Sequence, residues 1–565
     1  MRRLLLFAGA ALAFASPASA REYSLVIDDA RVTVAGRSTE GMTINGQLPG
    51  PTLRFTEGEE AVIHVRNDSD ETTSLHWHGL FVPAAMDGVP GMNGFNGIAP
   101  GESFTYRFTI RQNGTYWYHS HSGMQEQMGL YAPLIIDPAT PEADAPERDY
   151  VVFLSDFTTE HPRRILNNLR VDPGYYNNNH RTLGDFFRDA RTFGFSAAVR
   201  DRLAWGEMRM DPTDLADVSN YTFLMNGRPA AENETFLFHR GERVRLRLIN
   251  GSAMTYFDFR IPGLRLTVTA ADGRAVDPVE VDELRIAVAE TYDIIVEPTE
   301  DAAYTIFAES MDRSGYARGT LAPRAGMEAP IPSMRPRAIL TIADMGMSHG
   351  APSPAPMNHS MDHSQMDHGA ANDGADHAAM GHDMDAGLGN DGGVDGSGRT
   401  FGWGSEFPAD ARVLSYADLA AATPQADTRA AERDIIVRLT GNMERYIWTI
   451  NGVAMSDAEP INLRYGERAR LVFINETMMA HPMHLHGMFV QLENGMPAER
   501  LPDKHIVSVA PGQTYSVLLT ADEPGEWAFH CHLLYHMASG MMNRVVVARS
   551  DAAPPTAPQT SHEHH

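Results

Sequence analysis

Cysteine is almost absent from this sequence, because the 565 residues contain only one, Cys531. A single cysteine cannot form a disulfide within the chain, so stability must come from hydrophobic cores. Cys531 lies between two histidines in the segment EWAFHCHLLYHMASGMM (526–542). Taken alone, it fits a small buried side chain as well as a metal-binding thiol, and its neighbours have to decide between these interpretations.

Positive charge is scarce as well. The chain has 46 Lys and Arg against 73 Asp and Glu, a formal net charge of −27. Such an excess of negative charge argues against nucleic acid and against anionic membranes as partners. It suits a protein that handles cations.

Long apolar runs are lacking too, so no segment is expected to span a bilayer. The first twenty residues, MRRLLLFAGAALAFASPASA, combine two arginines, a short apolar stretch and a small-residue end. This pattern predicts a cleavable signal peptide at 1–20. We therefore expect export to the periplasm, by the twin-arginine or the general secretory route, and a soluble mature protein.

What the sequence does contain is an internal repeat. Its copies are FTEGEEAVIHVRND (55–68), FHRGERVRLRLING (238–251) and LRYGERARLVFINE (463–476). In each copy a Gly-Glu turn precedes alternating apolar residues, which is typical of a turn into a β-strand. A second repeated segment follows each copy: APGESFTYRF (99–108), VAETYDIIV (288–296) and APGQTYSVLL (510–519). The repeat predicts an all-β fold of three Greek-key β-sandwich domains.

The predicted domains occupy 21–140, 147–342 and 401–549. Residues from about 156 to 220 form an insertion in the middle domain, and 183–206 within it predicts one or two amphipathic helices. Residues 343–400, rich in Gly, Asp, His and Met, predict a disordered loop. Residues 550–565 predict a flexible tail.

Histidine pairs distinguish the copies. Two pairs occur in the first copy and two in the third: His76/His78, His119/His121, His484/His486 and His530/His532. Because side chains at i and i+2 of a strand share a face, each pair presents two imidazoles on one side. Eight imidazoles favour copper over calcium or magnesium. The middle copy has Phe257 and Phe259 instead, so we interpret it as a structural spacer without metal ligands.

The position of Cys531 now has an explanation. Alternation turns its sulfur to the strand face opposite to His530 and His532. There it can meet His481, His536 and Met541, and two His, one Cys and an axial Met form the blue-copper set. One strand would then contact a single copper through Cys531 and a copper cluster through the flanking histidines.

These segments carry a family resemblance. HWHG, YWYHSHSGMQEQMGLYAPLII, HPMHLHG and HCHLLYHMASGMM resemble the four copper motifs of the multicopper oxidases. LADVSNYTFLMNG (215–227), GDFFRDAR and the Met/His-rich loop resemble, more narrowly, the copper-resistance protein A type. The resemblance implies three cupredoxin-like domains, with a trinuclear copper cluster between the first and the third.

The resemblance also implies four copper ions and their ligands. It assigns the type 1 copper to His481, Cys531, His536 and Met541, and the type 2 copper to His76 and His484. It assigns one type 3 copper to His78, His119 and His532, and the other to His121, His486 and His530. Asp87 matches a carboxylate that relays protons to the cluster and, with Cys531, is the expected catalytic residue. Some relatives have a second acidic residue where this chain has Met537, so a second proton route is not expected on this ground.

The implied reaction couples one-electron oxidation of a substrate to four-electron reduction of O2 to water. We expect Cu(I) as the substrate and copper resistance as the role, because thioethers and imidazoles in the loop suit copper capture. The proposed capture residues, which would hold additional labile copper, are Met357, Met361, Met366, His359, His363 and His368. One alternative is a laccase-like oxidase of phenols or siderophores with the same sites. Another, of a different class, is a periplasmic protein that only stores or carries copper. A monomer is expected.

The axial Met541 predicts a moderate type 1 potential. Five further histidines match no copper motif and are interpreted as structural or surface groups: His64, His161, His180, His239 and His505.

Overall fold

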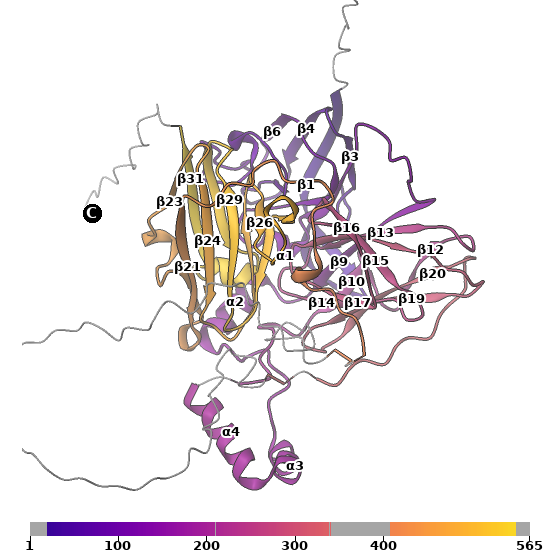
Figure 1. The fold of residues 1–565 in the computed structure, drawn as a ribbon, viewed down its shortest axis with the longest axis vertical. Helices are drawn as coiled ribbons and strands as arrows, with labels where there is room; N and C mark the ends of the chain where they lie inside the picture. Colours follow the sequence, from indigo (N-terminus) through magenta and orange to yellow (C-terminus); the bar gives the residue numbers. More distant parts are fainter. Residues whose placement is uncertain (1–19, 209–210, 338, 341–406, 409, 550–565) are drawn as a thin grey trace, which may run out of the picture.

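The computed structural model describes residues 20–208, 211–337, 339–340, 407–408 and 410–549 (Figure 1). The predicted signal peptide, except Ala20, the Met/His-rich loop at 343–400 and the tail at 550–565 lie outside these residues. Among the described residues, none of the helices combines the length and the apolar character that a membrane crossing requires.

The first copy of the repeat forms two four-stranded sheets, with strand orders β2-β1-β4-β6 and β3-β8-β7-β5. Their strands are β1 (Ala20–Val34), β2 (Arg37–Ile44), β3 (Leu53–Thr56), β4 (Glu60–Asn67), β5 (His76–His78), β6 (Ser103–Thr109), β7 (Gly114–His119) and β8 (Tyr131–Asp137). A short helix, α1 (Gln125–Met128), lies between β7 and β8.

The second copy forms a seven-stranded sheet, β11-β10-β9-β13-β18-β15-β16, and a five-stranded sheet, β12-β20-β19-β14-β17. Their strands are β9 (Arg148–Phe157), β10 (Thr222–Met225), β11 (Arg228–Pro229), β12 (Glu234–Leu237), β13 (Val244–Asn250), β14 (Phe257–Arg260), β15 (Leu266–Ala271), β16 (Arg274–Val281), β17 (Glu283–Ile286), β18 (Thr291–Val296), β19 (Tyr304–Ser310) and β20 (Tyr316–Ala322).

The third copy forms a six-stranded sheet, β22-β21-β24-β29-β26-β27, and a five-stranded sheet, β23-β31-β30-β25-β28. Their strands are β21 (Arg433–Asn442), β22 (Ile447–Ile450), β23 (Ile461–Arg464), β24 (Arg468–Asn475), β25 (His481–Leu485), β26 (Val490–Leu492), β27 (Asp503–Lys504), β28 (Ile506–Val509), β29 (Thr514–Thr520), β30 (Gly525–Cys531) and β31 (Met542–Ala548). The helix α5 (Leu534–Ala538) connects β30 to β31.

The three repeated segments occupy the same place in the three copies. They are β4, β13 and β24, and each pairs in parallel with the first strand of its copy, namely β1, β9 and β21. Each also pairs antiparallel with the second repeated segment, namely β6, β18 and β29. The alternating apolar residues of these strands face buried cores, as a half-buried strand requires. The predicted all-β fold of three sandwiches is confirmed.

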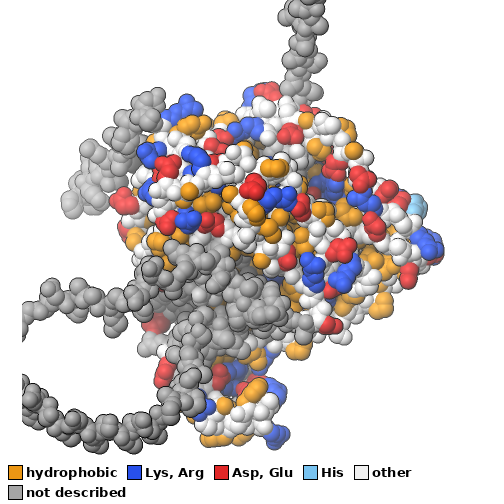
Figure 2. All heavy atoms as spheres, in the orientation of Figure 1, with side chains coloured by type: hydrophobic (Ala, Val, Ile, Leu, Met, Phe, Trp, Pro, Cys, Tyr) orange, Lys and Arg blue, Asp and Glu red, His pale blue; other side chains and the backbone are white. Residues whose placement is uncertain are grey.

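The insertion in the middle copy is helical, as predicted. It contains α2 (Pro162–Val171), α3 (Leu183–Phe193) and α4 (Phe195–Met208). The segment 183–206 forms two helices, because Gly194 interrupts it at a φ of +91° that other residues rarely adopt. In the space-filling view, α3 and α4 protrude from the body with apolar and basic side chains on their surface (Figure 2).

Candidate metal centre

Short antiparallel strand pairs align the histidine motifs within each terminal copy. In the first copy β5 pairs with β7, so that His76 lies opposite His119. In the third copy β25 pairs with β30, so that His484 lies opposite His530. Because the second histidine of each pair follows two residues later, every pair turns two rings toward the space between the two copies.

One set of three imidazoles converges through its Nε2 atoms. His530 Nε2 lies 3.3 Å from His121 Nε2 and 3.2 Å from His486 Nε2. The ligand atoms of these three residues lie within 4.8 Å of one another, as a shared metal ion requires.

The other five imidazoles lie directly beside this set. The ring centroid of His78 lies 5.6 Å from that of His119 and 4.9 Å from that of His532. His76 lies 5.9 Å from His484. All eight predicted rings therefore meet in one cluster between the first and third sandwiches.

Hydrogen bonds at Nδ1 orient several of these rings. His76 Nδ1 donates to the Asp87 carbonyl at 2.8 Å, and His486 Nδ1 lies 2.9 Å from Asp87 Oδ2. His484 Nδ1 donates to the His505 carbonyl at 2.8 Å. With Nδ1 occupied, the Nε2 lone pair of each ring is free to bind a metal, a common arrangement around ligating histidines.

Several ring nitrogens of the cluster are buried without a hydrogen-bond partner. They are Nε2 of His76, His119 and His484 and both nitrogens of His78 and His532. An unpaired buried polar atom costs about 1–3 kcal/mol. A group of seven such atoms in one place therefore indicates that an ion binds there. Imidazole nitrogens of this kind fit transition-metal ions, copper among them.

The protonation state of the rings suits metal binding. Burial is the main cause that lowers the pKa of His78, His119, His121, His484, His486 and His532. Burial likewise lowers the pKa of His530 to about 4. These seven rings are therefore neutral near pH 7, and the neutral imidazole is the form that binds metal.

Cys531 faces a second, separate group. Its Sγ lies 3.6 Å from His481 Nδ1 and 3.7 Å from His536 Nδ1, and the two Nδ1 atoms are 3.1 Å apart. All three residues are buried. Burial raises the pKa of the Cys531 thiol, so the thiolate needs a cation at this place. A bound metal ion would supply it.

Met541 belongs to the same neighbourhood. Its carbonyl accepts from the Cys531 N–H at 3.1 Å, and its own N–H donates to the His536 carbonyl at 3.0 Å. Its side chain is fully buried in the core that contains Cys531.

Three residues that sequence reasoning did not identify support the two histidines beside Cys531. His481 Nε2 lies 2.7 Å from Thr477 Oγ1, and His536 Nε2 lies 2.7 Å from Asp217 Oδ2. The Trp448 ring stacks on His536 at 3.9 Å between centroids. Asp217 comes from the middle copy, 319 positions before His536, so spacing alone could not have revealed this contact.

His505 lies against the cluster as well. Its side chain is fully buried, its ring centroid is 4.7 Å from that of His78, and neither ring nitrogen has a hydrogen-bond partner. The ligand atoms of His78, His484 and His505 lie within 4.8 Å of one another. His505 thus contacts the predicted ligands, although it belongs to none of the histidine pairs from which the cluster was predicted.

Comparisons with known proteins agree with this arrangement. Three family profiles, each described as multicopper oxidase, match residues 26–141, 181–325 and 428–551. The chain belongs to the multicopper oxidase family. It is therefore an oxidoreductase with copper as its cofactor.

Within this family the chain is similar to copper resistance proteins. It is 48% identical to copper resistance protein A of Escherichia coli, over 93% of this chain and 92% of the relative. It is also 48% identical to a copper resistance protein A homolog of Pseudomonas syringae pv. tomato, over 94% of this chain and 92% of the relative. A laccase structure from Botrytis aclada has a TM-score of 0.63 at 22% identity, covering 94% of this chain and 88% of the laccase, and supports the fold.

Proposed function

We propose that the protein is a cuprous oxidase, which couples the oxidation of Cu(I) to Cu(II) with the four-electron reduction of O2 to water. Four copper ions are proposed. The proposed type 1 ligands are His481, Cys531, His536 and Met541, and the proposed type 2 ligands are His76 and His484. One type 3 copper would be bound by His78, His119 and His532, and the other by His121, His486 and His530. The domain bounds proposed above, 21–140, 147–342 and 401–549, give each terminal domain half of the cluster.

The observation that carries the proposal is the arrangement around Cys531. Its sulfur faces His481 and His536, while the adjacent His530 lies among the cluster imidazoles. The backbone of two adjacent residues therefore joins the two groups. Copper bound there would supply one-electron transfer at the thiolate and O2 reduction at the cluster.

Asp87 is suited to supply protons to the cluster. It is 1% exposed and contacts His76 and His486 from its position beside both rings. A carboxylate so close to two predicted ligands could pass a proton into the space that the rings surround. Met537 has no ionisable group, and Asp87 is the proposed proton donor.

Copper as substrate is supported by the relatives, whose names state copper resistance. The proposed setting is the periplasm, and the proposed state is a monomer. Asp217, in the middle domain, accepts a hydrogen bond from His536 Nε2 and so holds the orientation of this proposed type 1 ligand. The Met/His-rich loop, with Met357, Met361 and Met366, is proposed to capture additional labile copper.

The visible spectrum of the copper-loaded protein tests the type 1 site. We expect the intense thiolate-to-copper absorption of a blue-copper centre, and we expect a Cys531→Ser variant to lose it while it retains three copper ions per chain. A wild-type spectrum without this absorption, or a variant that keeps it, contradicts the assignment.

Oxygen uptake tests the substrate. We expect faster uptake with Cu(I) than with a phenol, and deletion of residues 345–384 should slow only the reaction with Cu(I). Faster uptake with the phenol would make the protein a laccase-like oxidase, and no uptake with either would make it a copper store. Equal losses with both substrates in the deletion variant would contradict copper capture by the loop.

A further inference from the structure

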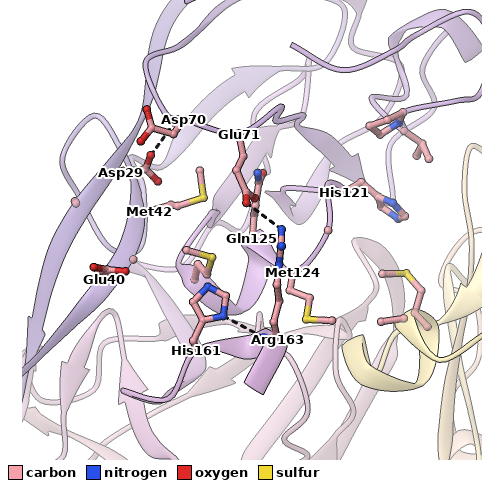
Figure 3. Close-up of a pocket in the computed structure, with 18 of the residues that line it drawn as sticks. Asp29, Glu40, Met42, Asp70, Glu71, His121, Met124, Gln125, His161 and Arg163 are labelled. Atoms are coloured by element: carbon pink, nitrogen blue, oxygen red, sulfur yellow. Dashed lines mark hydrogen bonds and ion pairs between the residues drawn. The ribbon is translucent and has the colours of Figure 1, made fainter. Parts of the chain in front are cut away.

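A cavity of about 920 Å³ adjoins the histidine cluster between the first and third sandwiches (Figure 3). Its wall includes residues of β1, β2, α1 and α5 and of the start of α2. Residues of both terminal domains therefore line it.

The wall of the cavity is rich in thioethers. Six methionines line it: Met42, Met124, Met128, Met455, Met537 and Met542. Met124, Met128, Met537 and Met542 are only half-buried. Figure 3 shows Met42 and Met124 around the same space as His121. Methionine that serves as core filler packs on all sides, as Met42 nearly does, whereas the four half-buried methionines are partly open to the cavity. Thioether sulfur is a soft donor that prefers Cu(I).

The cavity reaches the proposed copper ligands. His121 lines it and is the only half-buried ring among the eight cluster imidazoles, since the other seven are buried. On the other side Met542 lies opposite His530 in the β30–β31 pair, and Met537 directly follows His536. A metal ion in the cavity would therefore be next to the cluster without occupying it.

The charges around the cavity favour a cation. Its lining contains four carboxylates and two guanidinium groups: Asp29, Glu40, Asp70 and Glu71 with Arg31 and Arg163. Arg163 is paired with Glu71 at 2.9 Å, which leaves the other three carboxylates in excess over Arg31. A surplus of negative charge raises the local concentration of cations.

We propose that this cavity is a Cu(I)-binding site, in which thioethers of both terminal domains hold the ion and pass it to His121 while the cluster is loaded. The proposal depends on the ligand assignment of the proposed function, but not on Cu(I) being the substrate. It adds a copper position apart from the four ligand sets and from the Met/His-rich loop.

The test uses copper-loaded protein that lacks residues 345–384 and whose resident copper has first been reduced, so that neither the loop nor electron transfer to resident copper consumes the added Cu(I). Anaerobic titration with Cu(I) against the chelator bathocuproine disulfonate counts the ions bound beyond the resident copper. A Met124→Leu/Met537→Leu variant removes one thioether from each side of the cavity. The matched control is Met225→Leu/Met311→Leu, two methionines that are 0% and 5% exposed in the middle domain.

We expect one additional Cu(I) per chain in the parent and in the control, bound at least tenfold more weakly by the cavity variant. The proposed site is refuted if the additional ion is absent, or if both double variants bind it with equal affinity. The rate at which apo-protein gains cluster copper from Cu(I) should also fall in the cavity variant alone, and equal rates overturn the transfer to His121. Neither measurement involves turnover, so a protein inactive toward Cu(I) would refute the cuprous oxidase and leave the cavity site standing.

Discussion

At the scale of single residues, two buried carboxylates contact the two different groups of predicted ligands. Asp87 contacts His76 and His486 of the cluster, whereas Asp217 accepts from His536 Nε2 and from the Tyr446 hydroxyl, the latter at 2.6 Å. Carboxylates of this kind fix ring orientation and raise ligand basicity. Since each contacts a different group, their substitutions should affect different halves of the reaction.

We predict that Asp87→Asn and Asp217→Asn slow different steps of the reaction. Asp87→Asn should slow reoxidation of the reduced protein by O2 about 10–100-fold, because substitutions beside ligating histidines have effects of this size. Asp217→Asn should leave this step unchanged and slow reduction of the blue centre by substrate. Stopped-flow measurement of the blue absorption, in the reducing and in the oxidising direction, separates the two steps.

The two variants are controls for each other, because both exchange a buried carboxylate for an amide of the same shape. If both slowed the same step to the same extent, the separate roles of Asp87 and Asp217 would be refuted.

Residues at this scale differ in how far the sequence could predict them. The paired histidines were predictable, because a period of two places i and i+2 on one face wherever a strand forms. Asp217, Thr477 and His505 were not, because their contacts depend on how separate domains and loops pack.

At the scale of the element, both His-x-His-Gly motifs end in a glycine that a ring covers. Gly79 has φ +79°, and a methyl group on it would lie 2.4 Å from Cδ2 of His505. Gly487 has φ +69°, and a methyl group there would lie 2.3 Å from the Trp527 ring. The glycine thus permits both the left-handed turn after the strand and the close approach of the ring.

We predict that Gly79→Ala lowers the free energy of unfolding by more than the strain of the left-handed conformation alone would. Gly452→Ala is the matched control, because Gly452 has φ +75° and no atom within 4 Å of a methyl group. We expect a loss of unfolding free energy of about 1–2 kcal/mol for Gly452→Ala and about 2–5 kcal/mol for Gly79→Ala. Denaturant unfolding measures both.

Copper content should separate the same two variants. Gly79→Ala should hold less than its full copper, because the methyl group displaces His505, whose carbonyl orients His484. Gly452→Ala should keep it. Equal stability and copper content in the two variants would contradict a role for the contact with His505.

The strands were predictable as elements, since β4, β13 and β24 share a turn and an alternating pattern. The sequence of 183–206 predicts one or two helices, because Gly194 lies near its middle. Local pattern alone cannot tell whether a glycine interrupts a helix or is tolerated within it.

At the scale of the whole molecule, the middle domain does more than separate the other two. Asp272 accepts from the backbone N–H groups of His505 and Ile506 at 3.1 and 3.0 Å, and Lys504 Nζ lies 3.1 Å from it. Lys504 Nζ also lies 2.9 Å from Glu290. Two carboxylates of the middle domain thereby hold the segment whose carbonyl orients His484.

Lys504 is the only lysine of the chain and is 0% exposed. Burial opposes its charge, but Asp272 and Glu290 outweigh burial and raise its pKa above the usual 10.5. We predict that Lys504→Met lowers the unfolding free energy by about 3–5 kcal/mol at neutral pH, because two buried carboxylates lose their cation.

The pH dependence of this loss follows from the direction of the shift. A raised pKa in the folded state means that the stabilisation is complete below pH 10.5 and is lost as the pH rises through the folded pKa. The difference between wild type and Lys504→Met, measured by denaturant unfolding at equal copper content, should therefore shrink in strongly alkaline solution. A difference that stays constant there would exclude the charge of Lys504 as its cause.

The cluster draws four of its imidazoles from β5, β7 and the residues just after β7, and the other four from β25, β30 and the residues just after these two strands. A product that ends before His484 can carry at most four of the eight rings, however well its first domain folds. Synthesis has to reach His532 before all eight rings are present, and one proteolytic cut that releases the first or the third domain leaves only four of them.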